Sequence, residues 1–207
     1  MKITDVRCAI IGQNPVVRIV TDQGISGYGQ AESTKPYLKP FVLFYKDLLI
    51  GEDPTNVERC MLRIRRMGAF KPWGAAVSAI EMALWDAAGK AANVPVYKLL
   101  GGKVRDKVRV YNGSVRFPLE GQTPQHYADN MAKMKASKEG FTIIKQPVGY
   151  HSQMIAADPS LSYSDFVNAP RFPNRGLLTE RALDYIVECV QAMKNVLGKE
   201  VGLCLDC

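Results

Sequence analysis

The stretch that decides the fold runs from Ser78 to Gly102 and reads SAIEMALWDAAGKAANVPVYKLLGG. Apolar residues recur at helical spacing through its first part, which predicts an amphipathic helix with one buried stripe. The expected stripe consists of Val77, Ile80, Ala83, Leu84 and Ala87. The helix should break at Asn93-Val94-Pro95, and a second short apolar segment should end at the double glycine.

The residues before this helix predict a small antiparallel meander followed by two further helices. Runs rich in β-branched residues, separated by turn residues such as Asp22-Gln23-Gly24, favour strands. The expected strands are Lys2–Ile11, Pro15–Thr21 and Ile25–Glu32. The first helix is expected over about 38–50, and Asp53 should cap the second, with Pro54 in its first turn.

After Gly102 the pattern alternates between strands and helices, which is typical of parallel strands with helical crossovers. The expected strands are Val108–Ser114, Phe141–Val148 and Val201–Asp206, and the expected helices begin after Thr123 and Thr179. A (β/α) barrel needs roughly 200–250 residues, whereas 105 residues (103–207) follow Gly102. The chain therefore contains either a small three-stranded α/β domain or, as we expect, the first part of a barrel.

Composition narrows the function classes. Hydrophobic residues make up 47% of the 207 residues, but they form no long apolar run and no signal-peptide pattern, so we expect a cytoplasmic protein without a membrane partner. The net charge of +7 comes from scattered Lys and Arg without a nucleic-acid-binding motif, which favours anionic small molecules over nucleic acid. Five scattered cysteines are expected to be free thiols.

Candidate functional residues lie where the expected strands end. Lys145 comes near the end of the second strand, where a lysine can contact a substrate carboxylate, although a surface lysine would fit the same position. Asn112 and Ser114 end the first strand and are candidates for binding substrate hydroxyl groups. His151 follows the second strand and is a candidate acid or base. Asp206 ends the third strand.

The stretch from Ser78 to Gly102 resembles the junction between capping domain and barrel in the mandelate racemase and muconate-lactonizing branch of the enolase superfamily. The resemblance implies an α+β capping (lid) domain over residues 1–102, followed by a partial (β/α) barrel over residues 103–207. That barrel portion comprises the first three βα units of a TIM-type barrel.

The resemblance also assigns roles to residues. Family members hold Mg²⁺ with carboxylates at the ends of the third, fourth and fifth barrel strands, and Asp206 matches the first of these. They often carry a Lys-x-Lys pair on the second strand, of which Lys145 matches the first lysine while Pro147 replaces the second. A loop of the capping domain closes over the substrate, which makes Lys35 and Tyr37 candidate substrate contacts.

The function implied is Mg²⁺-dependent removal of the proton beside a carboxylate. Because Pro147 cannot accept a proton, we expect a one-base dehydration of a sugar acid to a 2-keto-3-deoxy acid, catalysed by a lyase. The alternatives are a racemase, epimerase or cycloisomerase that uses the same enolate, and a non-catalytic remnant. We expect the 207-residue chain alone to be inactive because two metal ligands would be missing, and we expect the protein to be a homo-oligomer.

Overall fold

The computed structural model describes residues 1–67, 74–113, 117–148, 154 and 178–206. The chain forms two compact units, Met1–Asp106 and Lys107–Cys207. The observed division falls four residues beyond the domain boundary expected from the sequence.

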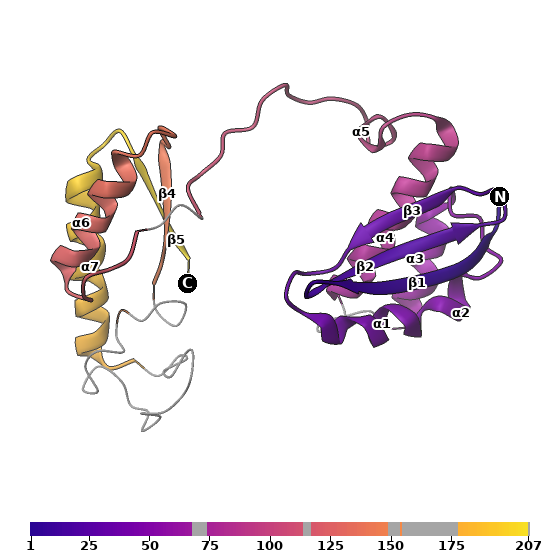
Figure 1. The fold of residues 1–207 in the computed structure, drawn as a ribbon, viewed down its shortest axis with the longest axis horizontal. Helices are drawn as coiled ribbons and strands as arrows, with labels where there is room; N and C mark the ends of the chain where they lie inside the picture. Colours follow the sequence, from indigo (N-terminus) through magenta and orange to yellow (C-terminus); the bar gives the residue numbers. More distant parts are fainter. Residues whose placement is uncertain (68–73, 114–116, 149–153, 155–177, 207) are drawn as a thin grey trace. The chain divides into compact units, whose positions relative to one another are not determined.

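The first unit is built on an antiparallel sheet in the order β1-β2-β3, formed by Ile3–Ile11, Asn14–Thr21 and Ser26–Gln30. This confirms the expected meander. Alternate residues of the central strand β2 are buried, among them Val17 and Ile19, because successive side chains of a strand point to opposite faces. One face of the sheet therefore forms the core beneath the helices (Figure 1).

Helix α4 (Gly74–Ala92) packs on strands β2 and β3 of this sheet. All the residues of the expected stripe are buried, which confirms the period read from the sequence. The approach is close because β3 has glycines where the helix crosses it. A Cβ atom at Gly27 would lie 1.9 Å from the carbonyl oxygen of Ala83, and one at Gly29 would lie 2.1 Å from that of Ala79.

Two side chains of α4 cover the outer edge of β3. Asp86 Oδ2 accepts a hydrogen bond from the backbone N–H of Tyr28 at 2.8 Å. Lys90 Nζ donates to the carbonyl oxygen of Ser26 at 2.9 Å, and the Asp86 and Lys90 side chains pair at 2.6 Å. We call Asp86 and Lys90 the edge pair; it satisfies backbone groups that a sheet edge would otherwise leave open.

The helix expected over 38–50 is divided, so that prediction was wrong in detail. A 3₁₀ turn, η1 (Pro36–Leu38), leads into α1 (Lys39–Phe44) and α2 (Lys46–Leu49). At the division the backbone N–H of Tyr45 donates to Val42 O at 3.3 Å, and that of Leu48 donates to Tyr45 O at 3.2 Å. These bonds span three residues instead of four, which tightens the chain around the buried Tyr45 ring.

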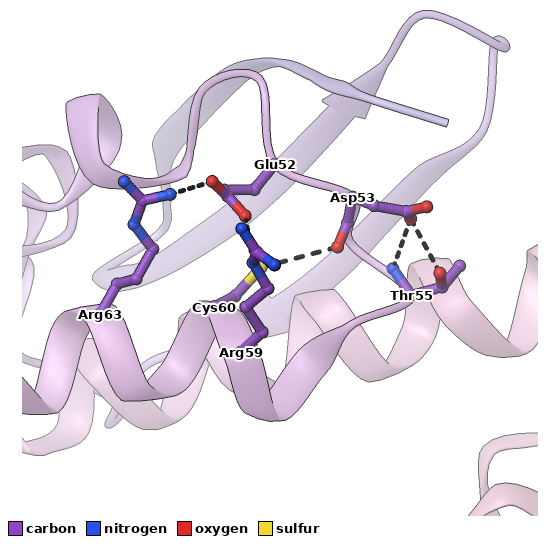
Figure 2. Close-up of polar contacts among 6 residues, drawn as sticks. All are labelled: Glu52, Asp53, Thr55, Arg59, Cys60 and Arg63. Atoms are coloured by element: carbon purple, nitrogen blue, oxygen red, sulfur yellow. Dashed lines mark hydrogen bonds and ion pairs between the residues drawn. The ribbon is translucent and has the colours of Figure 1, made fainter.

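The expected cap of the next helix was also wrong. Helix α3 (Val57–Arg66) begins after Asn56, three residues beyond Asp53. Asp53 Oδ1 instead accepts from the backbone N–H of Thr55 at 2.9 Å and from its hydroxyl at 2.8 Å, as Figure 2 shows. The Asp53 side chain thus closes a local turn, because it reaches its own neighbouring backbone before the helix begins.

Side chains of α3 also contact the turn that Asp53 closes. Glu52 pairs with Arg59 at 3.1 Å and with Arg63, while the Cys60 thiol donates to the carbonyl oxygen of Asp53 at 3.6 Å (Figure 2). The connection between α2 and α3 is therefore held by side chains of α3.

The break after α4 lies where the sequence places it. Asn93 has a positive φ of 54°, and Pro95 precedes the short helix α5 (Val96–Leu99). Gly101 and Gly102 have φ values of 104° and 97°, which favour glycine because a Cβ atom would be strained there.

The second unit contains β4 (Ile143–Pro147) and β5 (Gly202–Asp206), which pair in parallel as expected. Helices α6 (Pro124–Lys135) and α7 (Glu180–Leu197) pack together, and residues of all four elements form one core. The predicted caps are confirmed. The Thr123 hydroxyl accepts from the backbone N–H of His126 in a capping box, and that of Thr179 accepts from Ala182.

One expectation for this unit was wrong. The expected strand Val108–Ser114 is reduced, in its described part, to a single bridge between Asn112 and Ile144, and Val108 is 70% exposed. The buried residues of α7 are Ala182, Cys189, Met193 and Leu197, whereas Val187 is 65% exposed.

Among the described residues, no helix combines the length and the apolar character needed to cross a membrane.

Candidate active site

The carboxyl ends of β4 and β5 place a lysine and an aspartate on one face of the sheet. Lys145 lies opposite Cys204 in the register, and Asp206 follows two residues later, so the three side chains share a face. Lys145 Nζ lies 3.0 Å from Asp206 Oδ2. Two residues separated by 61 positions in the sequence are thereby brought into a direct ion pair.

Backbone hydrogen bonds fix this arrangement. The N–H of Val148 donates to Asp206 O at 2.9 Å, which joins the two strand ends. On the other side of β4, the N–H of Asn112 donates to Ile143 O and the N–H of Lys145 donates to Asn112 O, both at 2.8 Å. The strand β4, which carries Lys145, is therefore held by backbone hydrogen bonds along both of its edges.

Lys145 is kept in its charged form. The hydrogen bond that it donates to Asp206 raises the pKa of Lys145 above its ordinary value, and the nearby Asp206, Tyr111 and Cys204 act in the same direction. A lysine with a raised pKa remains an ammonium group at neutral pH. Such a group binds anions and is a poor base.

Pro147 shares the face of Lys145, and Gln146 lies on the opposite face. Gln146 is buried, and its amide donates to the carbonyl oxygen of Pro147 at 3.2 Å. Proline supplies neither a side-chain base nor a backbone N–H. The face that carries Lys145 therefore has a single amine on β4.

Of the other candidate residues, Asn112 lies in the second unit, Lys35 and Tyr37 lie in the first, and two lie outside the described residues. Asn112 is only 2% exposed, and its backbone bridges to β4. Lys35 pairs with Glu32 at 2.5 Å, and that hydrogen bond raises the pKa of Lys35. Tyr37, in η1, is exposed. Ser114 and His151 lie outside the described residues.

Asp206 supplies one oxygen donor of the kind that Mg²⁺ prefers. Within the part of the chain that the structure describes, no group of three His, Cys, Asp or Glu side chains gathers to hold a metal ion. Asp206 therefore fits one position of a magnesium site, and the described residues do not complete that site.

Sequence reasoning missed two neighbours of Lys145. Tyr111 places its ring centroid 5.8 Å from Lys145 Nζ, and Cys204 lies beside Lys145 in the strand register. The alternation of valines before Tyr111 predicted a strand that includes this residue, but only the pairing with β4 reveals which side chain the ring meets.

The meander packed on α4, continued by parallel strands and helices, defines an α+β protein with an N-terminal capping-type domain. Residues 9–101 match the mandelate racemase / muconate lactonizing enzyme N-terminal domain family. Together with the relatives described next, this match places the chain in the mandelate racemase and muconate-lactonizing branch of the enolase superfamily.

The chain is similar to a D-xylonate dehydratase of Haloferax volcanii, with 30% identity over 100% of this chain and 47% of the relative. It is 36% identical to a D-galactonate dehydratase of Ralstonia pickettii over 92% of this chain and 44% of the relative. A solved structure of an enolase-superfamily member from Salmonella Typhimurium matches with a TM-score of 0.74 and 26% identity, over 98% of this chain and 53% of that one. The chain thus spans about half the length of the relatives that it matches.

Proposed function

We propose that the protein catalyses Mg²⁺-dependent removal of the proton beside the carboxylate of a sugar acid, followed by loss of water to give a 2-keto-3-deoxy acid. The observation that carries the proposal is the Lys145–Asp206 pair at the carboxyl ends of neighbouring parallel strands. The dehydratase names of the relatives from Haloferax volcanii and Ralstonia pickettii support the reaction class.

In this proposal Lys145 binds the substrate carboxylate. Its ammonium group has three N–H donors, of which Asp206 accepts one in the structure. A hydrogen bond from an ammonium group to a carboxylate is charge-assisted and strengthens as negative charge accumulates on the carboxyl oxygens. Lys145 thereby makes the neighbouring carbon acid easier to deprotonate.

Asp206 is the proposed ligand that this chain contributes to Mg²⁺. When bound, the ion supplies positive charge that stabilises the carboxyl oxygens while the adjacent carbon loses its proton. In the same site Lys145 orients the carboxylate from the neighbouring strand.

Pro147 favours elimination over racemisation. A racemase needs a proton-transferring group on each side of the carbon, and Pro147 removes the amine that the second position of a Lys-x-Lys pair would supply. In a dehydration, one base takes the proton, one acid protonates the departing hydroxyl group, and the resulting enol becomes the 2-keto product. We propose His151 as an acid or base, and Lys35, Tyr37, Asn112 and Ser114 as substrate contacts.

The proposal also includes a cytoplasmic location and a homo-oligomer. Its partner is a small-molecule carboxylate, and neither nucleic acid nor a membrane is required.

The test is a panel of sugar acids assayed for 2-keto acid formation with and without Mg²⁺. We expect at least one member to be dehydrated only when Mg²⁺ is present. Dehydration that survives complete removal of divalent ions would contradict the proposed chemistry, and so would the absence of turnover on every acid in the panel.

Substitution of Lys145 tests the central residue. In Lys145→Ala we expect kcat/KM to fall by about 100- to 1,000-fold, because a charge-stabilising donor is lost, while the circular dichroism spectrum is unchanged. The matched control is Lys138→Ala, at an exposed position of the same unit, which should retain activity. Near-normal turnover in Lys145→Ala would remove Lys145 from the mechanism.

A further inference from the structure

The Tyr111 side chain lies beside Lys145, and packing in the core does not account for this position. Its ring centroid is 5.8 Å from Lys145 Nζ, within the range of a cation–π contact. Tyr111 is 51% exposed, so burial of its ring does not account for its position.

The backbone around Tyr111 is built to hold the ring there. The backbone N–H and C=O groups of Asn112, the next residue, each form a hydrogen bond of 2.8 Å with β4. At Gly113 a Cβ atom would lie 2.8 Å from Tyr111 Cε2, so glycine leaves the room that the ring occupies. The backbone next to Tyr111 is therefore held against β4, with its ring beside Lys145.

The two partners of Lys145 differ in charge, and this difference matters for an anionic substrate. Asp206 offers a full negative charge, which competes with a substrate carboxylate for the same ammonium group. An aromatic ring attracts the ammonium group through its quadrupole and carries no net charge. A ring can therefore fix the position of the ammonium group while its N–H donors remain available.

We propose that Tyr111 is a positioning residue that holds the Lys145 ammonium group at the strand end while it binds the substrate carboxylate. The contact between ring and ammonium is a property of the folded chain, and its role in substrate binding rests on the proposed function. The aromatic ring carries the effect and the hydroxyl group does not.

The contact itself is tested without substrate. A nearby aromatic ring shifts the ¹H and ¹³C resonances of the lysine ε-methylene group, and the Lys145 signal is assigned by its loss in Lys145→Arg. We expect Tyr111→Leu to move this signal toward the position of a solvent-exposed lysine and Tyr111→Phe to leave it in place. The matched control is Tyr97→Leu, which removes a comparable contact with Lys98, at 5.7 Å, and should leave the Lys145 signal unchanged.

The role in binding is tested by kinetics on the substrate that the panel identifies. In Tyr111→Leu we expect KM to rise roughly two- to thirtyfold, as loss of a cation–π contact implies, with a smaller change in kcat. Tyr111→Phe should restore the original KM. An unshifted Lys145 signal in Tyr111→Leu would overturn the inference, and so would a KM defect that phenylalanine does not rescue. Should the protein lack dehydratase activity, the proposed function fails, and the resonance shift still decides whether Tyr111 holds Lys145.

Discussion

At the scale of single residues, two tyrosines show what one hydroxyl group contributes. The Tyr45 hydroxyl is buried without a hydrogen-bond partner among the described residues, whereas that of Tyr185 donates to Gln122 O at 2.5 Å. An unpaired buried polar group is costly, and a paired one is not. The same chemical change should therefore have opposite effects at the two positions.

We expect Tyr45→Phe to raise the free energy of unfolding by about 1 kcal/mol and Tyr185→Phe to lower it by a similar amount. Chemical denaturation with matched m-values would measure both changes. A loss of stability in Tyr45→Phe would mean that the hydroxyl has a partner, such as a bound water molecule.

Asp5 gives the first unit a pH-dependent contribution to stability. Hydrogen bonds from Lys46 and then Arg7 lower the pKa of Asp5 from an ordinary value of 3.8 to about 2. Because the pKa is lower in the folded state, the contribution is complete above about pH 4 and is lost as the pH falls toward 2.

We expect Asp5→Asn to flatten the fall in stability between pH 4 and pH 2, by about 1 kcal/mol after allowance for solvent screening. Asp47→Asn, at an exposed position of α2, serves as the control and should retain the full slope. Parallel profiles for Asp5→Asn and the unsubstituted protein would contradict the assignment.

The sequence was sufficient to place the two charged residues of the candidate site, and it was insufficient for their neighbours. Lys145 and Asp206 are each a polar residue at the end of an apolar run, and parallel strands bring their ends to one edge. Tyr111 depends on a single backbone bridge between Asn112 and Ile144, which no local pattern encodes.

At the scale of elements, the contact between β3 and α4 depends on two glycines. In Gly27→Ala or Gly29→Ala, the new methyl group would overlap backbone atoms of α4. Its carbon would lie 1.9 or 2.1 Å, respectively, from a carbonyl oxygen of the helix. Backbone atoms of a buried helix cannot move aside as a flexible side chain can.

We therefore expect each substitution to lower the free energy of unfolding by about 3 kcal/mol or more. Gly74→Ala is the control, because a Cβ atom there meets nothing within 4 Å and alanine favours the helix. Thermal melts of the three variants would separate these outcomes, and a stable Gly27→Ala protein would show that α4 can shift.

The elements that the sequence predicted well are those in which a local pattern coincides with burial. Helix α4 has a continuous apolar stripe, and Thr123 and Thr179 cap their helices through their own side chains. Errors arose where tertiary packing decides the outcome. The division falls at the buried Tyr45, and in the described part of the expected strand Val108–Ser114 the bridge to β4 forms at Asn112.

At the scale of the whole molecule, the two units differ in the size of the sheet and of the core that the described residues form. The first has a three-stranded sheet with helices over one face and a single large core. In the second, the described residues form a sheet of two strands and a smaller core beneath α6 and α7. A two-stranded sheet depends on the helices packed against it for its stability, so the second unit has the smaller margin.

We expect residues 1–106 expressed alone to unfold in one cooperative transition, and residues 107–207 alone to associate or to unfold without cooperativity. Differential scanning calorimetry and analytical ultracentrifugation of the two fragments would measure this. A second fragment that melts sharply as a monomer would contradict the expectation.

The edge pair of α4 has a consequence for assembly. Asp86 and Lys90 occupy the backbone groups of Tyr28 and Ser26 that a fourth strand would need. An incoming chain would have to separate two opposite charges before gaining its first ladder bond. If copies of this protein associate, as we expect, we predict that they do so through other surfaces and not by strand pairing at the edge of β3.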